Sequence, residues 1–219
     1  MKCGAVIVAA GCGERLKAAK PKAFVMLGTK PLFQYSLDIF LAHPQINEVV
    51  LAVPEEEVSS FSKTPYKIVK GGATRQESVT CGLAALSPDC EAVLVHDAAR
   101  PFVNAAILDR LIASLAQKKS CIAAWPVSDT LKASQEGVIT HTIDRSSLWA
   151  AQTPQAFPVA ILKQALSKAA KENFVGTDEA SLVERLGVKV HLVIGDAGNI
   201  KVTTPEDWTL AEAVLKRPL

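Results

Sequence analysis

The residues best suited to chemistry lie in a loop that follows an apolar run near the start of the chain. Residues 11–22 read GCGERLKAAKPK and come directly after the run GAVIVAA at 4–10. Glycines let backbone N–H groups approach phosphate oxygens, and nearby cations supply compensating charge. The glycines and cations of this loop are Gly11, Gly13, Arg15, Lys17, Lys20 and Lys22. The pattern favours a triphosphate-binding loop, and the alternative is a solvated turn.

Two common phosphate-binding motifs do not fit this loop. The dinucleotide motif G-x-G-x-x-G requires glycine where this chain has Leu16, and the sequence contains no G-x-x-x-x-G-K-[ST] motif. Pro21 fixes its own φ and disfavours helix at the preceding residue, so we expect Lys20 and Lys22 to lie on an extended segment. Both cations could then reach one phosphate chain.

A second predicted strand, 91–96, ends at Asp97. Magnesium prefers one or two carboxylates together with phosphate oxygens and water, so Asp97 beside a triphosphate loop could hold Mg²⁺. Asp97 could instead cap the helix that follows, but Asn104 is better placed for that role. Arg100 could line the site or form an ion pair with Asp97.

A third predicted strand ends in the segment KGGATRQESV at 70–79. Its glycines, including Gly72, permit close approach of a base or ribose because they carry no side chain. Arg75 and Ser78 lie one helical turn apart in the helix expected to follow. The three strand ends together favour a nucleotide site at one edge of a sheet.

The elements that must position these strand ends alternate between strand and helix. Apolar runs predict strands at 3–9, 46–53, 66–72, 91–97, 121–127 and 188–195. Helical patterns cover 31–43, a segment from about Thr74, 105–117, 158–171, 178–186 and 205–216. Strands without polar alternation are buried on both faces, which predicts an α/β fold with a doubly wound, mostly parallel sheet. Ligands of such sheets bind outside the carboxyl ends of the strands.

This alternation stops between Ser128 and Thr153. Two short alternating runs, 129–133 and 138–144, flank a polar Ser-Gln-Glu-Gly turn and predict a protruding β-hairpin arm at about 128–153. We find no repeat, linker or low-complexity segment. The expected organisation is therefore one domain over 1–219 that carries this arm.

Composition excludes several classes of protein. The chain has 219 residues, 49% of them hydrophobic, and a net charge of +2 with 5% aromatic residues, which does not indicate nucleic-acid binding. The apolar run at 4–10 is too short for a membrane span or a signal peptide, so we expect a cytoplasmic protein with no membrane partner. Five scattered cysteines without a C-x-x-C pair argue against disulfides and zinc.

Eight segments extend these motifs along the chain. They are AAGCGERL…KPK (9–22), GGATRQESV (71–79), HDAARPF (96–102), DT (129–130), HTIDR (141–145), LWAAQTPQAF (148–157), TDEASLVE (177–184) and NIKVTTPED (199–207). In this order, and over nearly the whole length, they resemble the 2-C-methyl-D-erythritol 4-phosphate cytidylyltransferase family. The resemblance implies a Rossmann-like sheet. It also implies transfer of the cytidylyl group of CTP to 2-C-methyl-D-erythritol 4-phosphate in non-mevalonate isoprenoid biosynthesis, with release of pyrophosphate.

The resemblance also implies roles for individual residues. Arg15 and Lys22 would stabilise the transition state, and Arg145 and Lys201 would join them in catalysis by holding the acceptor phosphate. Acceptor-binding threonines would be Thr130, Thr153 and Thr177. The cytidine and triphosphate would lie against Ala9, Ala10, Gly11, Gly13, Gly72, Arg75, Ser78, Asp97, Ala98 and Arg100, with Mg²⁺ on Asp97. The family dimerises through its hairpin arm, so Arg145 would act on the partner's site.

Elementary chemistry agrees with this reaction. A phosphate monoester, with a second pKa near ~6, is already an anionic nucleophile at neutral pH and needs no general base. Arg145 could instead pair with Asp144, and Lys201 could be a surface lysine. Two other functions remain open on the sequence: a cytidylyltransferase acting on ribitol 5-phosphate, and a nucleotide-binding regulator without turnover.

Overall fold

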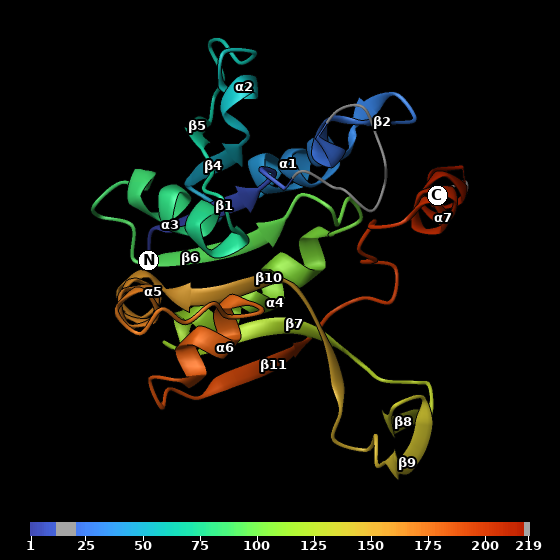
Figure 1. Ribbon diagram of the computed structural model, residues 1–219. Coiled ribbons are helices and arrows are strands. Elements are labelled where there is room, and N and C mark those ends of the chain that lie inside the picture. Colours follow the sequence, from blue (N-terminus) through green and yellow to red (C-terminus); the bar gives the residue numbers. More distant parts are fainter. Residues whose placement is uncertain (12–20, 217–219) are drawn as a thin grey trace.

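A seven-stranded sheet forms the centre of the protein in the computed structural model, which describes residues 1–11 and 21–216 (Figure 1). The order across the sheet is β11, β7, β10, β6, β1, β4, β5. The strands are β1 (Cys3–Val8), β4 (Glu48–Val53), β5 (Lys67–Lys70), β6 (Ala92–Asp97), β7 (Ser120–Pro126), β10 (Trp149–Pro158) and β11 (Val190–Ile194). Only β10 runs antiparallel to its neighbours within this sheet, which confirms the predicted mostly parallel arrangement.

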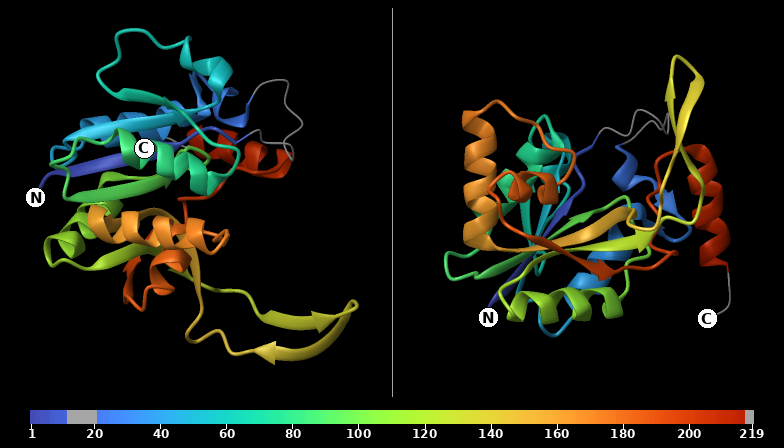
Figure 2. Two further views of the ribbon diagram at one scale, coloured as in Figure 1. Left: turned by 60° about the vertical axis from the view of Figure 1, so that its left-hand side comes forward. Right: turned by 90° about the horizontal axis from the view of Figure 1, so that it is seen from below.

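Helices cover both faces of the sheet, as the unbroken apolar strands predicted (Figure 2). One face packs against α1 (Leu32–Ala42) and α4 (Ala105–Ala116). The other face packs against α3 (Arg75–Ala85), α5 (Val159–Lys171) and α6 (Glu179–Glu184). In β1 the side chains alternate between these two cores, with Ile7 in the first and Val6 in the second.

Smaller elements surround the carboxyl edge of the sheet. They are the 3-10 helix η2 (Lys22–Phe24), the two-residue strands β2 (Met26–Leu27) and β3 (Lys30–Pro31), α2 (Glu55–Val58) and α7 (Pro205–Leu215). A small cluster of Leu27, Leu32, Val202 and Ala211 holds α7 against β2 and α1. None of the helices in the described ranges is long and apolar enough to cross a membrane.

The predicted hairpin is present as an arm that extends away from the sheet (Figures 1 and 2). Strands β8 (Leu131–Gln135) and β9 (Val138–Ile143) pair antiparallel, and Glu136 and Gly137 both have positive φ in the turn between them. Val138 and Ile139 are 69% and 61% exposed. The arm therefore presents apolar surface to its surroundings in the single chain.

Two local expectations were wrong. We expected Lys22 to lie on an extended segment, but it is the first residue of η2. Pro21 is itself extended, with ψ of 131°, and occupies the N-cap position, so the helical turn begins directly after it. Strand β10 was not expected, because the sequence QTPQ lacks apolar alternation and contains a proline. The pairing of β10 with β7 shifts register between Ala151 and Gln155, so the proline lies at an irregularity.

Candidate active site

The end of β1 lies beside Asp97, because β1 and the neighbouring strand β6 end at the same edge of the sheet. Strands β1 and β6 are parallel, and their register sets Val8 opposite Asp97. The residues after β1 therefore pass beside the Asp97 carboxylate. This is the arrangement predicted from the apolar runs that end at the same edge of the sheet.

A cavity of about 540 Å³ opens at this edge, and we call it the larger cavity. Its lining comes from the end of β1, from η2, from the β5–α3 connection and from the end of β6. The residues predicted to bind nucleotide or stabilise charge that line it are Ala9, Ala10, Gly11, Lys22, Gly72, Arg75, Ser78, Asp97, Ala98 and Lys201. Residues separated by almost 200 positions thus surround one space.

The two glycines after β5 are required by the protein's own packing. A Cβ on Gly71 would lie 2.3 Å from Ala10 Cβ, and one on Gly72 would lie 2.2 Å from Glu77 Cβ. Ser78 Oγ accepts a hydrogen bond of 3.1 Å from Gly72 N and donates one of 2.9 Å to Thr74 O. The two glycines therefore let the β5–α3 connection pack closely against Ala10 and Glu77, and this packing forms part of the cavity wall.

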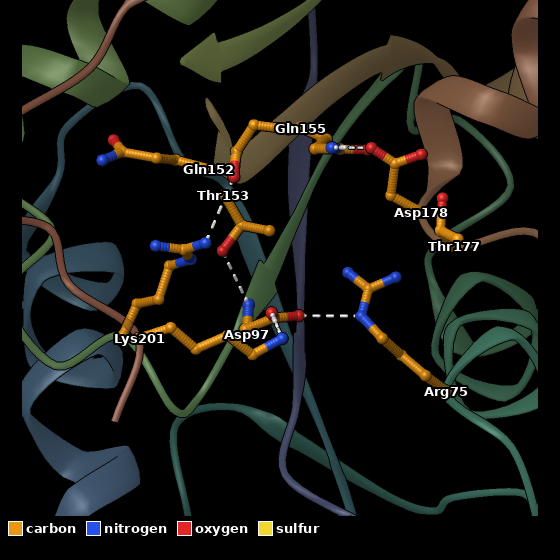
Figure 3. A pocket seen from close by; sticks show the side chains of 10 residues that line it. Arg75, Asp97, Gln152, Thr153, Gln155, Thr177, Asp178 and Lys201 are labelled. Atoms are coloured by element: carbon orange, nitrogen blue, oxygen red, sulfur yellow. Dashed lines mark hydrogen bonds and ion pairs between the residues drawn. The ribbon is translucent and has the colours of Figure 1, made fainter. Parts of the chain in front are cut away.

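Asp97 has a cationic partner on each carboxylate oxygen (Figure 3). Arg75 Nε donates to Oδ1 at 2.8 Å, and Lys201 Nζ lies 2.7 Å from Oδ2. Burial disfavours the ionised form of this 6% exposed residue, but Arg75 and Lys201 outweigh it and hold the pKa of Asp97 well below its usual range. Asp97 is therefore a carboxylate anion at neutral pH.

Arg100 does not form the ion pair with Asp97 that we had considered. Its Nη1 donates to Asn199 O at 2.8 Å and its Nη2 to Ala151 O at 3.3 Å. The expected cap of the following helix is confirmed, because Asn104 Oδ1 accepts a hydrogen bond from Ile107 N at 3.1 Å. Arg100 therefore ties the end of β6 to the chain segments that pass over it.

A second, smaller cavity of about 210 Å³ adjoins the first. It contains Thr153 from β10 and Thr177 from the loop before α6, both predicted to bind the acceptor, and it also contains Arg100. Arg75, Asp97 and Lys201 line both cavities. The carboxylate and its two cations therefore form the boundary between two adjoining spaces.

Lys22 reaches the larger cavity from η2. Its Nζ donates a hydrogen bond of 2.8 Å to Val202 O, next to Lys201. This contact joins the first loop to the segment that carries Lys201. Two further predicted residues, Gly13 and Arg15, lie outside the described residues, as do Lys17 and Lys20.

The arm residues Thr130 and Arg145 lie apart from both cavities. Both are exposed, and neither is among the described residues that line the two spaces. Asp144 accepts hydrogen bonds from Ser146 N and Oγ, each at 2.9 Å. Thr130 and Arg145 are thus not brought to the site of their own chain in this structure.

Two buried residues near Asp97 were not predicted as site residues from the sequence. Glu179, which is 1% exposed, accepts hydrogen bonds from Arg75 Nη1 and Nη2 at 2.7 and 3.0 Å. His96 is fully buried and contacts Thr153 Oγ1 through Nδ1. Both lie within quoted segments, TDEASLVE and HDAARPF, but only their neighbours were chosen as site residues. A signal was available for Glu179, because an acid next to apolar Ala180 and Leu182 needs a partner when buried.

No dedicated metal cage is visible in the part of the chain that the structure describes, where no group of three or more His, Cys, Asp or Glu side chains converges. A lone carboxylate fits Mg²⁺ that would take its other ligands from phosphate and water, provided that Lys201, the more exposed of the two cations on Asp97, gives up its oxygen. Asp97 could therefore serve as the protein ligand of Mg²⁺. It could not by itself hold a metal such as zinc, which requires several protein ligands.

The fold and the site together define an α/β nucleotidyltransferase, in which Gly11, Gly72 and the strand-end carboxylate of Asp97 line one cavity at the carboxyl edge of a mostly parallel sheet. A sequence profile of the 2-C-methyl-D-erythritol 4-phosphate cytidylyltransferases matches residues 3–217, and the chain belongs to this family. The family member from Bacillus pumilus is 46% identical over 96% of this chain and 95% of its own length. The Haemophilus influenzae member is also 46% identical, over 97% of this chain and 96% of its own.

Solved structures agree with this assignment. The crystal structure of 2-C-methyl-D-erythritol 4-phosphate cytidylyltransferase from Thermus thermophilus is similar to this structure, with a TM-score of 0.84 and 34% sequence identity. The superposition covers 99% of this chain and 100% of the Thermus chain. The 4-diphosphocytidyl-2C-methyl-D-erythritol synthase from Anaerococcus prevotii has a TM-score of 0.86 and 31% identity, with 99% of each chain covered. The predicted fold and family are confirmed.

Proposed function

We propose that this chain transfers the cytidylyl group of CTP to 2-C-methyl-D-erythritol 4-phosphate, giving 4-diphosphocytidyl-2-C-methyl-D-erythritol and pyrophosphate. The observation that carries the proposal is the boundary between the two cavities, where Asp97 and Lys201 face both spaces. The larger cavity would hold CTP and the smaller one the acceptor. The family relationship favours this acceptor over ribitol 5-phosphate, and an enzyme over a regulator without turnover.

The chemical step needs charge compensation and alignment more than acid–base catalysis. An oxygen of the acceptor phosphate would attack the α-phosphorus of CTP as the bond to the pyrophosphate oxygen breaks. Both reactants are anions, so Lys22 and Lys201 would lower their mutual repulsion, together with Arg15 and Arg145. Lys201 fits the acceptor side of this step, because it lines both cavities and its side chain is 39% exposed.

Magnesium is the cofactor we propose for Asp97. Bound there with the triphosphate, it would neutralise phosphate charge and favour pyrophosphate as the leaving group. Lys201 Nζ lies 2.7 Å from Oδ2 of Asp97. With Asp97 holding the ion, Lys201 would be available to the acceptor phosphate.

A homodimer through the arm would account for the isolated position of Arg145. The exposed Val138 and Ile139 could pack against a second copy, and Arg145 and Thr130 would then approach the partner's acceptor cavity. Sedimentation of the parent and of Ile139→Asp would test this. A parent dimer that dissociates on substitution supports the arm interface, and a parent monomer contradicts it.

Pyrophosphate release tests the reaction itself. CTP, UTP, ATP and GTP would each be combined with methylerythritol phosphate or ribitol 5-phosphate, with and without Mg²⁺. Release that requires CTP, methylerythritol phosphate and Mg²⁺ is the expected result. Equal or faster release with ribitol 5-phosphate would overturn the acceptor assignment, and no release with any pair would overturn the reaction. Asp97→Asn is the matched control for the metal.

A further inference from the structure

Glu179 is an almost completely buried carboxylate that the proposed reaction does not use. It is the first residue of α6 and is 1% exposed, although acids are rarely buried to this extent unless they are paired. Its partner is Arg75, which lies 104 residues earlier and gives one terminal nitrogen to each carboxylate oxygen, at 2.7 and 3.0 Å. This is the two-pronged geometry that arginine prefers with carboxylates.

Arg75 connects Glu179 to Asp97. Its remaining inner nitrogen, Nε, donates to Asp97 Oδ1 at 2.8 Å (Figure 3). One guanidinium therefore bridges the carboxylates of Asp97 and Glu179. The side chain of Lys201, on Oδ2, is 39% exposed, whereas that of Glu179 behind Arg75 is 1% exposed. One oxygen of Asp97 thus has a partner anchored in the core, and the other has a partner at the surface of the site.

A different pairing is available to these same groups. If the terminal nitrogens of Arg75 were not held by Glu179, the guanidinium could turn and present two nitrogens to Asp97. Both oxygens of Asp97 would then be occupied by one arginine, and Oδ2 would be held by this core-anchored group in place of the more exposed Lys201. Stability alone does not explain the ionic arrangement, because well-packed apolar residues often stabilise a core as well as a buried ion pair does.

We propose that Glu179 is a positioning residue, which holds Arg75 so that the guanidinium occupies Oδ1 of Asp97 and leaves Oδ2 for a divalent cation. The inference rests on the proposed metal-binding role of Asp97. Glu179 acts entirely through Arg75 and touches no substrate. Residues that orient a metal ligand typically contribute 10- to 100-fold to metal affinity.

Binding of Mn²⁺ in the presence of CTP, without acceptor and hence without turnover, measures this role directly. The free Mn²⁺ would be followed by electron paramagnetic resonance for the parent and for Glu179→Gln, which keeps the size of the side chain and removes its charge. We expect the variant to bind Mn²⁺ about tenfold more weakly. Binding within twofold of the parent, in a variant that unfolds cooperatively, would overturn the proposal.

Two further variants make the outcome decisive. Glu172→Gln removes a carboxylate that pairs with Arg185 at the surface, at 2.6 Å, and should bind Mn²⁺ as the parent does. Arg75→Lys keeps the charge but lacks the planar fork that gives two nitrogens to Glu179 and a third to Asp97, and it replaces Glu179→Gln if that variant does not fold. It should show the same weakening, and parent-like binding would overturn the proposal.

Failure of the underlying metal assignment has a different signature. Asp97→Asn should abolish the tight Mn²⁺ site, and if it binds as well as the parent, or the parent shows no site, both the metal assignment and the role of Glu179 are wrong. If Asp97→Asn loses the site and the Glu179 and Arg75 variants keep it, only the role of Glu179 is wrong.

Discussion

Thr153 and His96 form a hydrogen bond of 3.1 Å in the interior, and its direction is set by the other ring nitrogen of the histidine. His96 Nε2 lies 3.1 Å from Arg100 O, and a carbonyl oxygen can only accept, so Nε2 carries the proton. His96 Nδ1 therefore accepts from the Thr153 hydroxyl, whose oxygen accepts from Asp97 N at 3.0 Å. The hydroxyl proton of Thr153 is committed to His96, which gives Thr153 a role in positioning Asp97.

Thr153→Val should therefore destabilise the protein. Valine has the same shape but leaves Asp97 N–H and His96 Nδ1 without partners in the interior, and each unsatisfied buried group costs about 1–3 kcal/mol. We expect a loss of about 2 kcal/mol or more in the free energy of unfolding, measured with urea. Thr153→Ser keeps the hydroxyl and should retain most of this stability. If the valine variant is as stable as the parent and only its acceptor KM rises, Thr153 is a direct acceptor ligand.

The buried His96 should make stability depend on pH. Burial lowers the pKa of His96 to about 4 from its ordinary value of 6.5, so between these values the unfolded chain binds a proton that the folded chain does not. Stability should fall as the pH drops from 6.5 to 4, by up to about 3 kcal/mol from this group. Urea unfolding of the parent and of His96→Gln across this range should give converging curves. Burial also raises the pKa of Glu179, which makes stability increase as the pH falls. This opposite dependence is present in both proteins and does not affect the difference between them.

Parallel curves for the two proteins would show that His96 is not the group responsible. Stability at pH 8 serves as the reference, because the folded and the unfolded His96 are both almost entirely neutral there.

Gly71→Ala should impair nucleotide binding. The added methyl would lie 2.3 Å from Ala10 Cβ and 2.9 Å from Ser78 Oγ, so the connection after β5 must move away from the end of β1. Overpacking of this kind costs roughly 1–3 kcal/mol. We expect the KM for CTP to rise about tenfold with a smaller effect on the KM for the acceptor. Gly4→Ala is the matched control, because its methyl would be overpacked to a similar degree against Leu86 at 2.7 Å and Cys90 at 2.9 Å, at the other end of β1 and away from the cavity, and should leave the KM for CTP unchanged.

Lys22→Ala should slow turnover. A well-placed cation that stabilises developing charge contributes about 10²–10³ to kcat, and Lys22 Nζ lies at the larger cavity on Val202 O. The same loss is expected for Arg15→Ala. Lys30→Ala, which removes an exposed lysine paired with Asp38, is the control and should turn over as the parent does. Turnover of Lys22→Ala within about threefold of the parent would exclude a catalytic role.

Arg145→Ala should act on the acceptor and spare CTP. We expect the KM for methylerythritol phosphate to rise at least about tenfold, as is usual when a charge-assisted contact to phosphate worth about 1.5–3 kcal/mol is lost. Mixed dimers of Arg145→Ala and Lys22→Ala would tell whether the residue acts across the dimer. Recovery of about a quarter to a half of parent turnover is expected if one of the two sites receives all its intact residues. No recovery would place Arg145 in its own chain's site.

Much of the fold could be predicted because apolar runs mark strands that are buried on both faces. The strand ending at Asp97 and the helix capped by Asn104 agree with their predicted bounds to within one residue. Strand β10 was not predicted because residues 152–155 place polar side chains and Pro154 inside the sheet. The hydrogen-bonding groups of these side chains are satisfied by partners from distant elements. Gln155, for example, donates to Asp178 Oδ2 at 2.7 Å and accepts from Ala180 N at 3.0 Å.

The sequence predicted which residues line the site better than it predicted the contacts between them. Asp97 and Lys201 were expected to hold different ligands, and only the three-dimensional structure shows them paired with each other. No local pattern could connect Arg75 to Glu179, because their contact depends on which helix packs beside which across 104 residues. Spacing in the sequence identifies elements, whereas ion pairs between elements follow from the topology.

The turn of the arm at Glu136 and Gly137 projects from the body and divides the site between two stretches of chain. Asp97 and Arg75 precede this turn, whereas Thr153, Glu179 and Lys201 follow it. A polypeptide cut there would leave the Asp97 carboxylate on one fragment and most of the residues that contact or position it on the other. Activity regained on mixing the fragments would then report their reassembly, which makes this loop a natural place to build a split enzyme.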